Sequence, residues 1–271
     1  MKKLLILCGV AAMMLACATN PLTGKKELSF AVLSGKTASL IPDAYQQYGT
    51  FLKESKVITG TADATKVQNV GTKIKNAAIQ WMDSRGFSSQ IANYQWEYKL
   101  VQNNELNAWC MPGGKIAVFS GIMSVTKDEA GLATVMGHEV AHALLGHSAE
   151  RIGKAEAIAK GDRTVSAAFG GKSATLQNVI GAVYGIGSNL ALLAYSRADE
   201  SEADRLGLTL MAIAGYNPDT AVSFWQRMAA QGSASTPELL STHPSDETRI
   251  ADIKKLIPEA KTEAAKFGKK Y

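Results

Sequence analysis

The spacing of apolar residues predicts a chain that is largely helical. Between residues 65 and 84, apolar side chains recur every three or four positions, at Val67, Val70, Ile74, Ala78 and Trp81. This spacing places them on one face of a helix. The chain offers comparable helical stretches at residues 42–54, 128–151, 176–195, 196–214 and 218–231, and a lysine-rich stretch at its end. Residues 160–172 are polar and rich in glycine, which predicts a loop.

A small sheet is predicted before the stretch at 128–151. Residues 94–101 alternate between apolar and polar side chains, which is the period of a strand. Residues 106–111 and 115–120 flank Pro112-Gly113-Gly114, which predicts a β-hairpin. We therefore expect an α+β fold that is mostly helical.

The apolar stretch at 176–195 is long enough to cross a membrane. Three glycines and four polar residues interrupt it, namely Gln177, Asn178, Ser188 and Asn189. These interruptions favour a buried core helix, broken near residues 185–187, over a membrane span.

The first sixteen residues have the pattern of an export signal. Lys2 and Lys3 precede an apolar run over residues 4–15 that is too short to span a bilayer. The following Met14-Leu15-Ala16-Cys17 resembles a bacterial lipobox, which implies that Cys17 is lipidated and becomes the mature N-terminus. Ala18 rather than Asp follows it, and the resemblance then favours the periplasmic face of the outer membrane. The alternative is an ordinary signal peptide with a chance cysteine.

These features predict a lipoprotein signal peptide over residues 1–16, a lipidated tether over 17–35 and one domain over 36–271. With 271 residues, 46% of them hydrophobic, the chain is long enough for such a domain to bury its own core. Loss of Cys8 and lipidation of Cys17 would leave Cys110 alone, so a monomer would hold no internal disulfide. Cys110 lies in an apolar stretch, which favours a buried structural thiol over a nucleophile.

The formal net charge of +5 comes from scattered basic residues, apart from lysines near the end of the chain. No base-stacking pattern of aromatic residues accompanies them, so we expect no nucleic-acid partner.

The segment His138-Glu139-Val140-Ala141-His142 has the spacing of a metal site. Residues i and i+4 of a helix lie about 40° apart around its axis, so both imidazoles can converge on one ion. Glu139 is about 100° from His138 and could reach a water beside the metal. Zinc lowers the pKa of such a water towards about 7, and Glu139 could accept its proton and pass it to the departing amine. The alternative is a helix with two ordinary histidines, which would be costly to bury in an apolar helix.

A catalytic zinc needs three protein ligands. His147 is nine residues from His138, about 180° round a continuous helix, so we expect only a polar contact from it. The richest source of a third ligand is the acidic run at residues 199–204. Glu200 as ligand, with Asp204 hydrogen-bonded to a ligand histidine, fits this pattern. Asp199 and Glu202 are expected to be exposed.

Small residues would allow this acidic helix to approach the motif helix closely. They are Ser196, Ala203 and Gly207 on one side and Gly137 and Ala141 on the other.

Four motifs in order resemble the zinc peptidase family that contains HtpX, the OMA-type proteases and the CAAX prenyl endopeptidases, metallopeptidase family forty-eight. They are G-H-E-V-A-H at 137–142, S-R-A-D-E-S-E-A-D at 196–204, N-A-W-C-M-P-G-G-K-I at 107–116, and H-P at 243–244 with R-I at 249–250. The resemblance covers about residues 21–260. It implies a zincin-like (gluzincin) fold holding one zinc ion on His138, His142 and Glu200.

The resemblance also implies that the strand at 106–111 pairs with an extended substrate, through Asn107, Ala108, Trp109 and Cys110. His243 and Arg249 would lie at the open side of the metal and stabilise the oxyanion, or His243 would occupy the open site at rest. For His243 the alternative is a loop residue before a proline.

These inferences predict a zinc-dependent endopeptidase that acts on unfolded or misassembled cell-envelope proteins. A chaperone-like assembly factor that binds unfolded chains in the same groove is the alternative. The intact Glu139 favours the enzyme, because a binding protein needs no base beside a metal.

Overall fold

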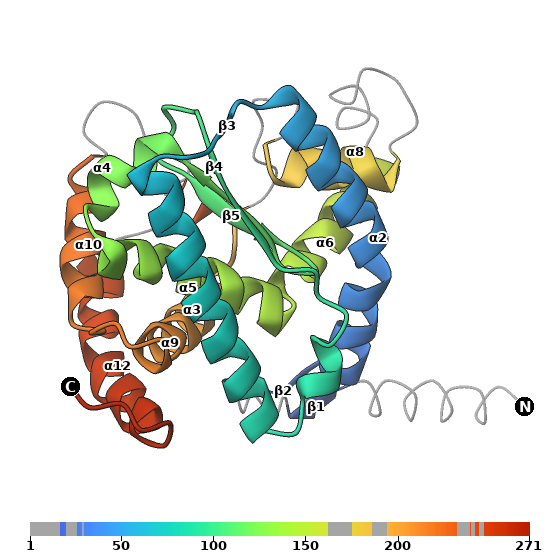
Figure 1. Ribbon diagram of the computed structural model, residues 1–271. Helices are drawn as coiled ribbons and strands as arrows, with labels where there is room; N and C mark the ends of the chain where they lie inside the picture. The colour runs from blue at the N-terminus through green and yellow to red at the C-terminus, as the bar shows by residue number, and fades with distance from the viewer. Residues whose placement is uncertain are drawn as a thin grey trace, which may run out of the picture.

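The computed structural model describes residues 17–19, 26–28, 30–161, 175–185, 194–231, 239, 242–243 and 247–271. A four-stranded sheet lies at its centre, with helices on both faces (Figure 1). The strands are β3 (Val57–Ile58), β4 (Glu97–Val101), β5 (Ala108–Met111) and β6 (Lys115–Phe119). Their order is β3-β4-β6-β5, with β4 and β6 parallel and the other pairs antiparallel, so β5 forms one edge.

Side chains of the hairpin alternate between two apolar cores, one on each face of the sheet. Ala108 and Cys110 point into the first core, whereas Trp109 and Met111 point into the second. The hairpin of β5 and β6 confirms the sequence prediction, and β4 is shorter than the predicted strand at 94–101.

The first core lies beneath five helices, among them the two that carry the H-E-x-x-H motif and Glu200. The five are α3 (Ala62–Ser84), α5 (Glu129–Leu145), α9 (Arg197–Ile213), α10 (Thr220–Ala229) and α12 (Glu247–Ala265). Thr61 caps α3 by accepting a hydrogen bond from the Ala64 amide. The apolar positions that predicted this helix are all buried in it.

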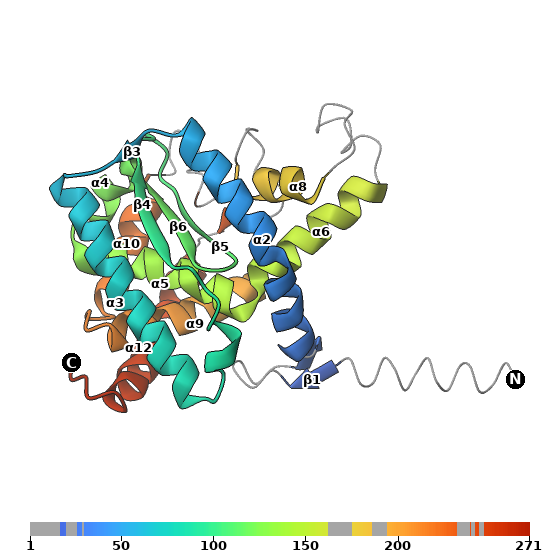
Figure 2. The same cartoon turned by 45° about the vertical axis from the view of Figure 1, so that its right-hand side comes forward.

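The second core is covered by α2 (Phe30–Glu54), α6 (His147–Gly161) and α8 (Leu176–Val183). Figure 2 shows these three helices together, away from α3 and α12. Helix α2 includes Pro42 and is longer than the predicted helix at 42–54. Because it begins at Phe30, the last six residues of the predicted tether are helical. Two short strands, β1 (Cys17–Thr19) and β2 (Lys26–Leu28), pair within the same segment.

The prediction of one continuous helix over 128–151 was wrong. Helix α5 begins after Asp128, whose side chain accepts from the Gly131 amide, and it ends at Leu145. Gly146 has a φ of +81°, which only glycine adopts at little cost, and α6 begins at the next residue. The short α4 (Met123–Thr126) precedes Asp128.

Helix α8 ends at Val183, and a turn follows at Gly185, whose φ is +69° and which lies within the predicted break at 185–187. Within the ranges that the structure covers, no helix combines the length and apolarity needed to cross a membrane. Most of the loop predicted at 160–172 lies outside the described residues.

Candidate metal centre

Helices α5 and α9 meet at two glycines, as the small residues of both segments predicted. A Cβ atom on Gly137 would lie 2.9 Å from the Gly207 carbonyl oxygen, and one on Gly207 would lie 2.9 Å from the Cα of His138. No larger residue fits this contact without displacing backbone. The contact brings the motif helix against the helix that carries Glu200.

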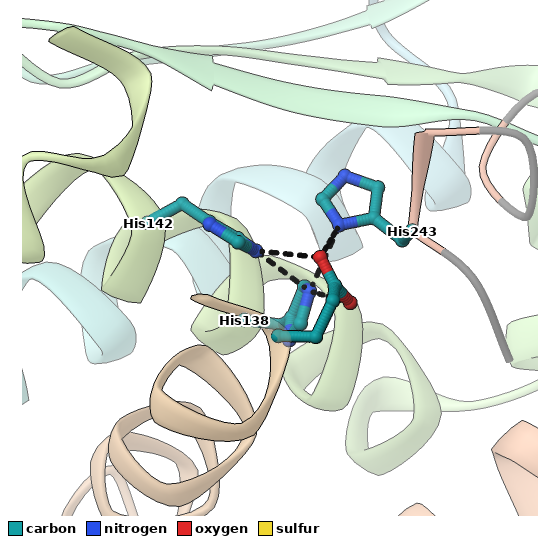
Figure 3. Close-up of side chains that lie close together, drawn as sticks. His138, His142 and His243 are labelled. Atoms are coloured by element: carbon teal, nitrogen blue, oxygen red, sulfur yellow. Dashed lines mark hydrogen bonds and ion pairs between the residues drawn. The ribbon is translucent and has the colours of Figure 1, made fainter. Parts of the chain in front are cut away.

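Four buried side chains converge here and could hold one metal ion. His138 and His142 come from α5 and Glu200 from α9, and His243 joins them from the segment before α12. One ligand atom from each lies within 4.8 Å of all the others. Figure 3 shows the three imidazoles pointing toward one another.

The spacing of the donors fits tetrahedral zinc. The Nε2 atoms of His138 and His142 are 3.1 Å apart, and they lie 3.5 Å and 3.3 Å from the two Glu200 oxygens. Bonds of about 2.0–2.1 Å to a tetrahedral ion place donor atoms about 3.3 Å apart. Nitrogen and carboxylate donors are also the ligands that zinc takes in catalytic sites.

His243 lies on the same cluster. Its Nδ1 is 2.8 Å from Glu200 Oε1 and 3.1 Å from His138 Nε2. Its Nε2 is 3.5 Å from Glu139 Oε1. His243 therefore lies where a fourth metal ligand would lie, beside His138, His142 and Glu200.

Glu139 lies next to the cluster without joining it. Its side chain is 3% exposed, and its Oε1 makes no hydrogen bond to any described residue. Burial raises the pKa of Glu139, although His243 and His138 oppose the shift. A buried carboxylate oxygen without a hydrogen bond is suited to accept a proton from a small molecule such as water.

Asp204 and Arg249 contact residues of the cluster. Asp204 Oδ1 is 3.0 Å from His138 Nδ1, and Arg249 donates to both Asp204 oxygens at 2.8 Å. Arg249 Nη1 also lies 2.8 Å from Glu200 Oε2, and its guanidinium stacks 3.8 Å over the Trp225 ring. Arg249 thus bridges two carboxylates, and its role towards an oxyanion stays a prediction.

The carboxylates favour positive charge among the rings. Burial opposes charge on His138, but Glu200 and Asp204 outweigh it and raise the pKa of His138 to about 9. Burial likewise opposes ionisation of Glu200, yet His243 and His138 hold its pKa well below the usual range. Burial lowers the pKa of His142 well below its ordinary value. A divalent cation would satisfy the same demand for positive charge.

His147 makes polar contacts, as expected, but the sequence did not predict that it and Glu202 reach this region. His147 Nδ1 lies 3.0 Å from His142 Nδ1, and His147 Nε2 lies 3.4 Å from Glu202 Oε2. The Glu202 side chain is only 10% exposed, so the prediction of an exposed Glu202 was wrong. Asp199 instead caps α9 in a reciprocal arrangement with Ser196. Gly146, four residues after His142, was the sequence signal that the motif helix ends there.

The edge strand β5 borders the cluster, and two of its outward backbone groups already have partners. The Ala108 amide donates to the Asn107 side chain at 2.8 Å, and the Cys110 carbonyl accepts from the Tyr184 hydroxyl at 3.3 Å. Both partners cover positions where another strand would pair. The Cys110 thiol is buried and free, which agrees with a structural thiol.

A narrow cleft joins β5 to the cluster. Its walls include Asn107, Ala108 and Trp109 with Glu139 and His243, as the sequence predicted for the substrate side. Arg151, Tyr184 and Tyr195 also line the cleft and were not singled out from sequence. The volume of about 20 Å³ holds about one water and no peptide residue.

Comparison with known proteins agrees with this geometry. Residues 68–257, which include both helices of the cluster, match the family described as Peptidase family M48. The chain belongs to peptidase family M48. This assignment confirms the resemblance inferred from the four motifs.

Individual relatives in the family include mitochondrial proteases and a bacterial one. The chain is 38% identical over 177 residues to the mitochondrial metalloendopeptidase OMA1 of Schizosaccharomyces pombe, covering 64% of this chain and 50% of the relative. It is 32% identical over 203 residues to OMA1 of Saccharomyces cerevisiae, covering 72% and 56%. It is 29% identical over 166 residues to the beta-barrel assembly-enhancing protease of Escherichia coli (strain K12), covering 59% and 34%. The chain thus spans about half the length of the yeast relatives.

Proposed function

We propose that this protein is a zinc-dependent endopeptidase. The observation that carries the proposal is the buried Glu139 oxygen, which accepts no hydrogen bond from the described residues and lies beside a cluster of donors spaced for one tetrahedral ion. In this reading His138, His142 and Glu200 are the metal ligands, and Glu139 is the catalytic base. Names of relatives as metalloendopeptidases support the same activity.

Each of these residues would have a separate role in peptide hydrolysis. A zinc ion in this site supplies Lewis acidity, which polarises the scissile carbonyl and makes a water acidic near neutral pH. Glu139 accepts the proton of the attacking water and delivers it to the leaving amide nitrogen. Asp204 orients His138 through Nδ1, and Arg249 holds Asp204 and Glu200 in place.

An extended substrate would add to β5 as a further strand. Side chains of β5 alternate between the two cores, so its free edge offers backbone groups to a partner chain. Such pairing reads backbone shape more than sequence, which suits unfolded polypeptides as substrates. Asn107 and Tyr184 would have to release the Ala108 amide and the Cys110 carbonyl first.

His243 would fill the fourth ligand position in this closed arrangement. Its Nδ1 is at ligand distance from the other donors, and the cleft beside it has no room for a substrate residue. Substrate binding then requires His243 to move away, after which it could reach the oxyanion.

The physiological substrates would be unfolded or misassembled proteins of the cell envelope. This part of the proposal uses the lipobox at residues 14–17, with a signal peptide over 1–16, a lipidated tether over 17–35 and the peptidase domain over 36–271. Lipidation of Cys17 would hold the protein at the periplasmic face of the outer membrane. A relative named for enhancing β-barrel assembly fits an envelope role.

The test compares digestion of unfolded casein by the purified zinc-loaded protein and by its Glu139→Gln variant. We expect cleavage by the wild type and a loss of about 10²–10⁴-fold in the variant, with zinc binding retained. Equal cleavage by both would exclude Glu139 as the base. If neither cleaves but both bind zinc and casein, the chaperone-like alternative is the better description.

A further inference from the structure

His147 is placed against a ligand histidine by the break between α5 and α6. The left-handed Gly146 ends α5 and turns the chain, so that the first residue of α6 faces back toward the cluster. His147 is 6% exposed, and its Nδ1 lies 3.0 Å from the Nδ1 of the fully buried His142. On a continuous helix the two rings could not meet in this way.

The chemistry of the two rings fixes which one donates. His142 presents its Nε2 to the donor cluster, where the lone pair of that nitrogen is needed for a metal. The proton of neutral His142 is therefore on Nδ1, and His147 accepts it at its own Nδ1. The proton of His147 is then on Nε2, which faces Glu202 Oε2 at 3.4 Å. An ionised carboxylate can only accept a hydrogen bond. The protons therefore point in one direction, from His142 to His147 and from His147 towards Glu202.

We propose that His147 and Glu202 are positioning residues that hold His142 in the ring orientation and tautomer that bind the metal. The inference rests on the proposed metal site and adds an outer support to it. His138 has a direct carboxylate support in Asp204, 3.0 Å from its Nδ1. His142 receives the equivalent support through one intervening histidine. Partners of this kind orient ligands and raise their basicity, and their loss costs about 10–100-fold in metal affinity.

The surroundings of Glu202 make the substitutions interpretable. Glu202 borders an open pocket of about 290 Å³, so its truncation leaves no sealed cavity. Glu259 lies on the rim of the same pocket, pairs with Arg205 and provides a matched control.

The experiment measures zinc affinity by competition with a chromophoric chelator and the visible spectrum of the cobalt-loaded protein. We expect His147→Ala to weaken zinc binding about 10–100-fold and to alter the cobalt bands. His147→Asn can keep an acceptor near the position of Nδ1, and it should recover most of the affinity. Glu202→Ala should weaken binding in the same direction, whereas Glu259→Gln should leave affinity and spectrum unchanged. Thermal unfolding of each metal-free variant reports whether the fold is intact.

The outcomes distinguish a role of His147 and Glu202 in metal binding from a role in packing alone. Wild-type affinity in both His147→Ala and Glu202→Ala would overturn the inference. So would equal weakening in His147→Ala and His147→Asn with an unchanged cobalt spectrum, because that pattern indicates lost packing. A wild-type protein that binds no zinc would overturn the metal centre itself and this inference with it.

Discussion

At the scale of single residues, the proposed enzyme would use the same few atoms in both a resting and a working arrangement. His243 is the clearest case, because its Nδ1 contacts Glu200 and His138 while its Nε2 faces Glu139. In the proposed enzyme, a side chain in that position would exclude substrate from the open side of the cluster. Its departure would free the fourth position and leave Glu139 access to water.

His243→Ala should therefore raise kcat/KM for a short unstructured peptide. If one molecule in ten is open at rest, removing the block gains about tenfold. The measurement is steady-state hydrolysis of a quenched fluorescent peptide, with zinc content checked in both proteins. A fall of about 10²-fold would instead assign His243 to the oxyanion, as the other prediction from sequence has it. Unchanged kinetics would remove His243 from both roles.

At the scale of secondary-structure elements, the site depends on how closely α5 and α9 approach. Gly207→Ala places a Cβ 2.9 Å from the Cα of His138, which is backbone and cannot rotate away. We expect a loss of about 1–3 kcal/mol in the free energy of unfolding, together with weaker zinc binding as His138 shifts. Urea unfolding and the chelator competition measure the two effects.

The control for this substitution is Gly49→Ala in α2, where nothing lies within 4 Å of the added Cβ. It should be stabilising by about 0.5–1 kcal/mol, because alanine is favoured over glycine inside a helix. If Gly207→Ala is as harmless as Gly49→Ala, the close contact does not set the position of the ligands.

The edge strand gives a second prediction at this scale. In Tyr184→Phe the Cys110 carbonyl loses its hydroxyl donor, and a substrate amide can satisfy it without competition. One hydrogen bond contributes about 0.5–1.5 kcal/mol, so KM for an extended peptide should fall by up to about tenfold. Tyr48→Phe removes a hydroxyl from the carbonyl of Ile116 in β6, away from the edge, and should leave KM unchanged. An unchanged or higher KM in Tyr184→Phe would argue against pairing at Cys110.

Most elements were predictable because their signals are local. The apolar period of α3, the glycine turn of the hairpin and the i, i+4 histidines each depend on neighbours in sequence. The end of α5 at Gly146 was missed, because an apolar helical pattern continues on both sides of it. With that end misplaced, the contact of His147 with His142 and the burial of Glu202 could not be foreseen.

The walls of the cleft were unpredictable for a different reason. Arg151 and Tyr195 lie 44 positions apart in sequence, and neither belongs to a motif with its own spacing rule. Only the packing of α6 beside the sheet brings the Arg151 guanidinium over the Tyr195 ring, at 4.8 Å.

At the scale of the whole molecule, the sheet separates the helices that carry candidate metal ligands from the helices that cover its other face. Helices α5 and α9 on one face carry three of the candidate metal ligands, and α2, α6 and α8 cover the other face. The edge strand β5 lies between them and is bonded by Tyr184, which follows α8. In the proposed enzyme, access of a substrate strand would thus be coupled to the helices of the second face, while three of the four candidate ligands stay on helices of the first.

The final prediction concerns where the molecule resides. Cys17→Ser should move the protein from the membrane fraction to the soluble periplasmic fraction of a Gram-negative host, because acyl chains would supply the attachment. Each buried methylene contributes about 0.8 kcal/mol, so two or three chains hold a protein that a single chain would hold only weakly. Cys110→Ser is the matched control, since that thiol is buried in the core and should not affect fractionation. Radiolabelled palmitate should enter the wild type and Cys110→Ser but not Cys17→Ser. A Cys17→Ser protein that stays in the membrane fraction would show that another segment makes the attachment, and the tether assigned to residues 17–35 would then have to be abandoned.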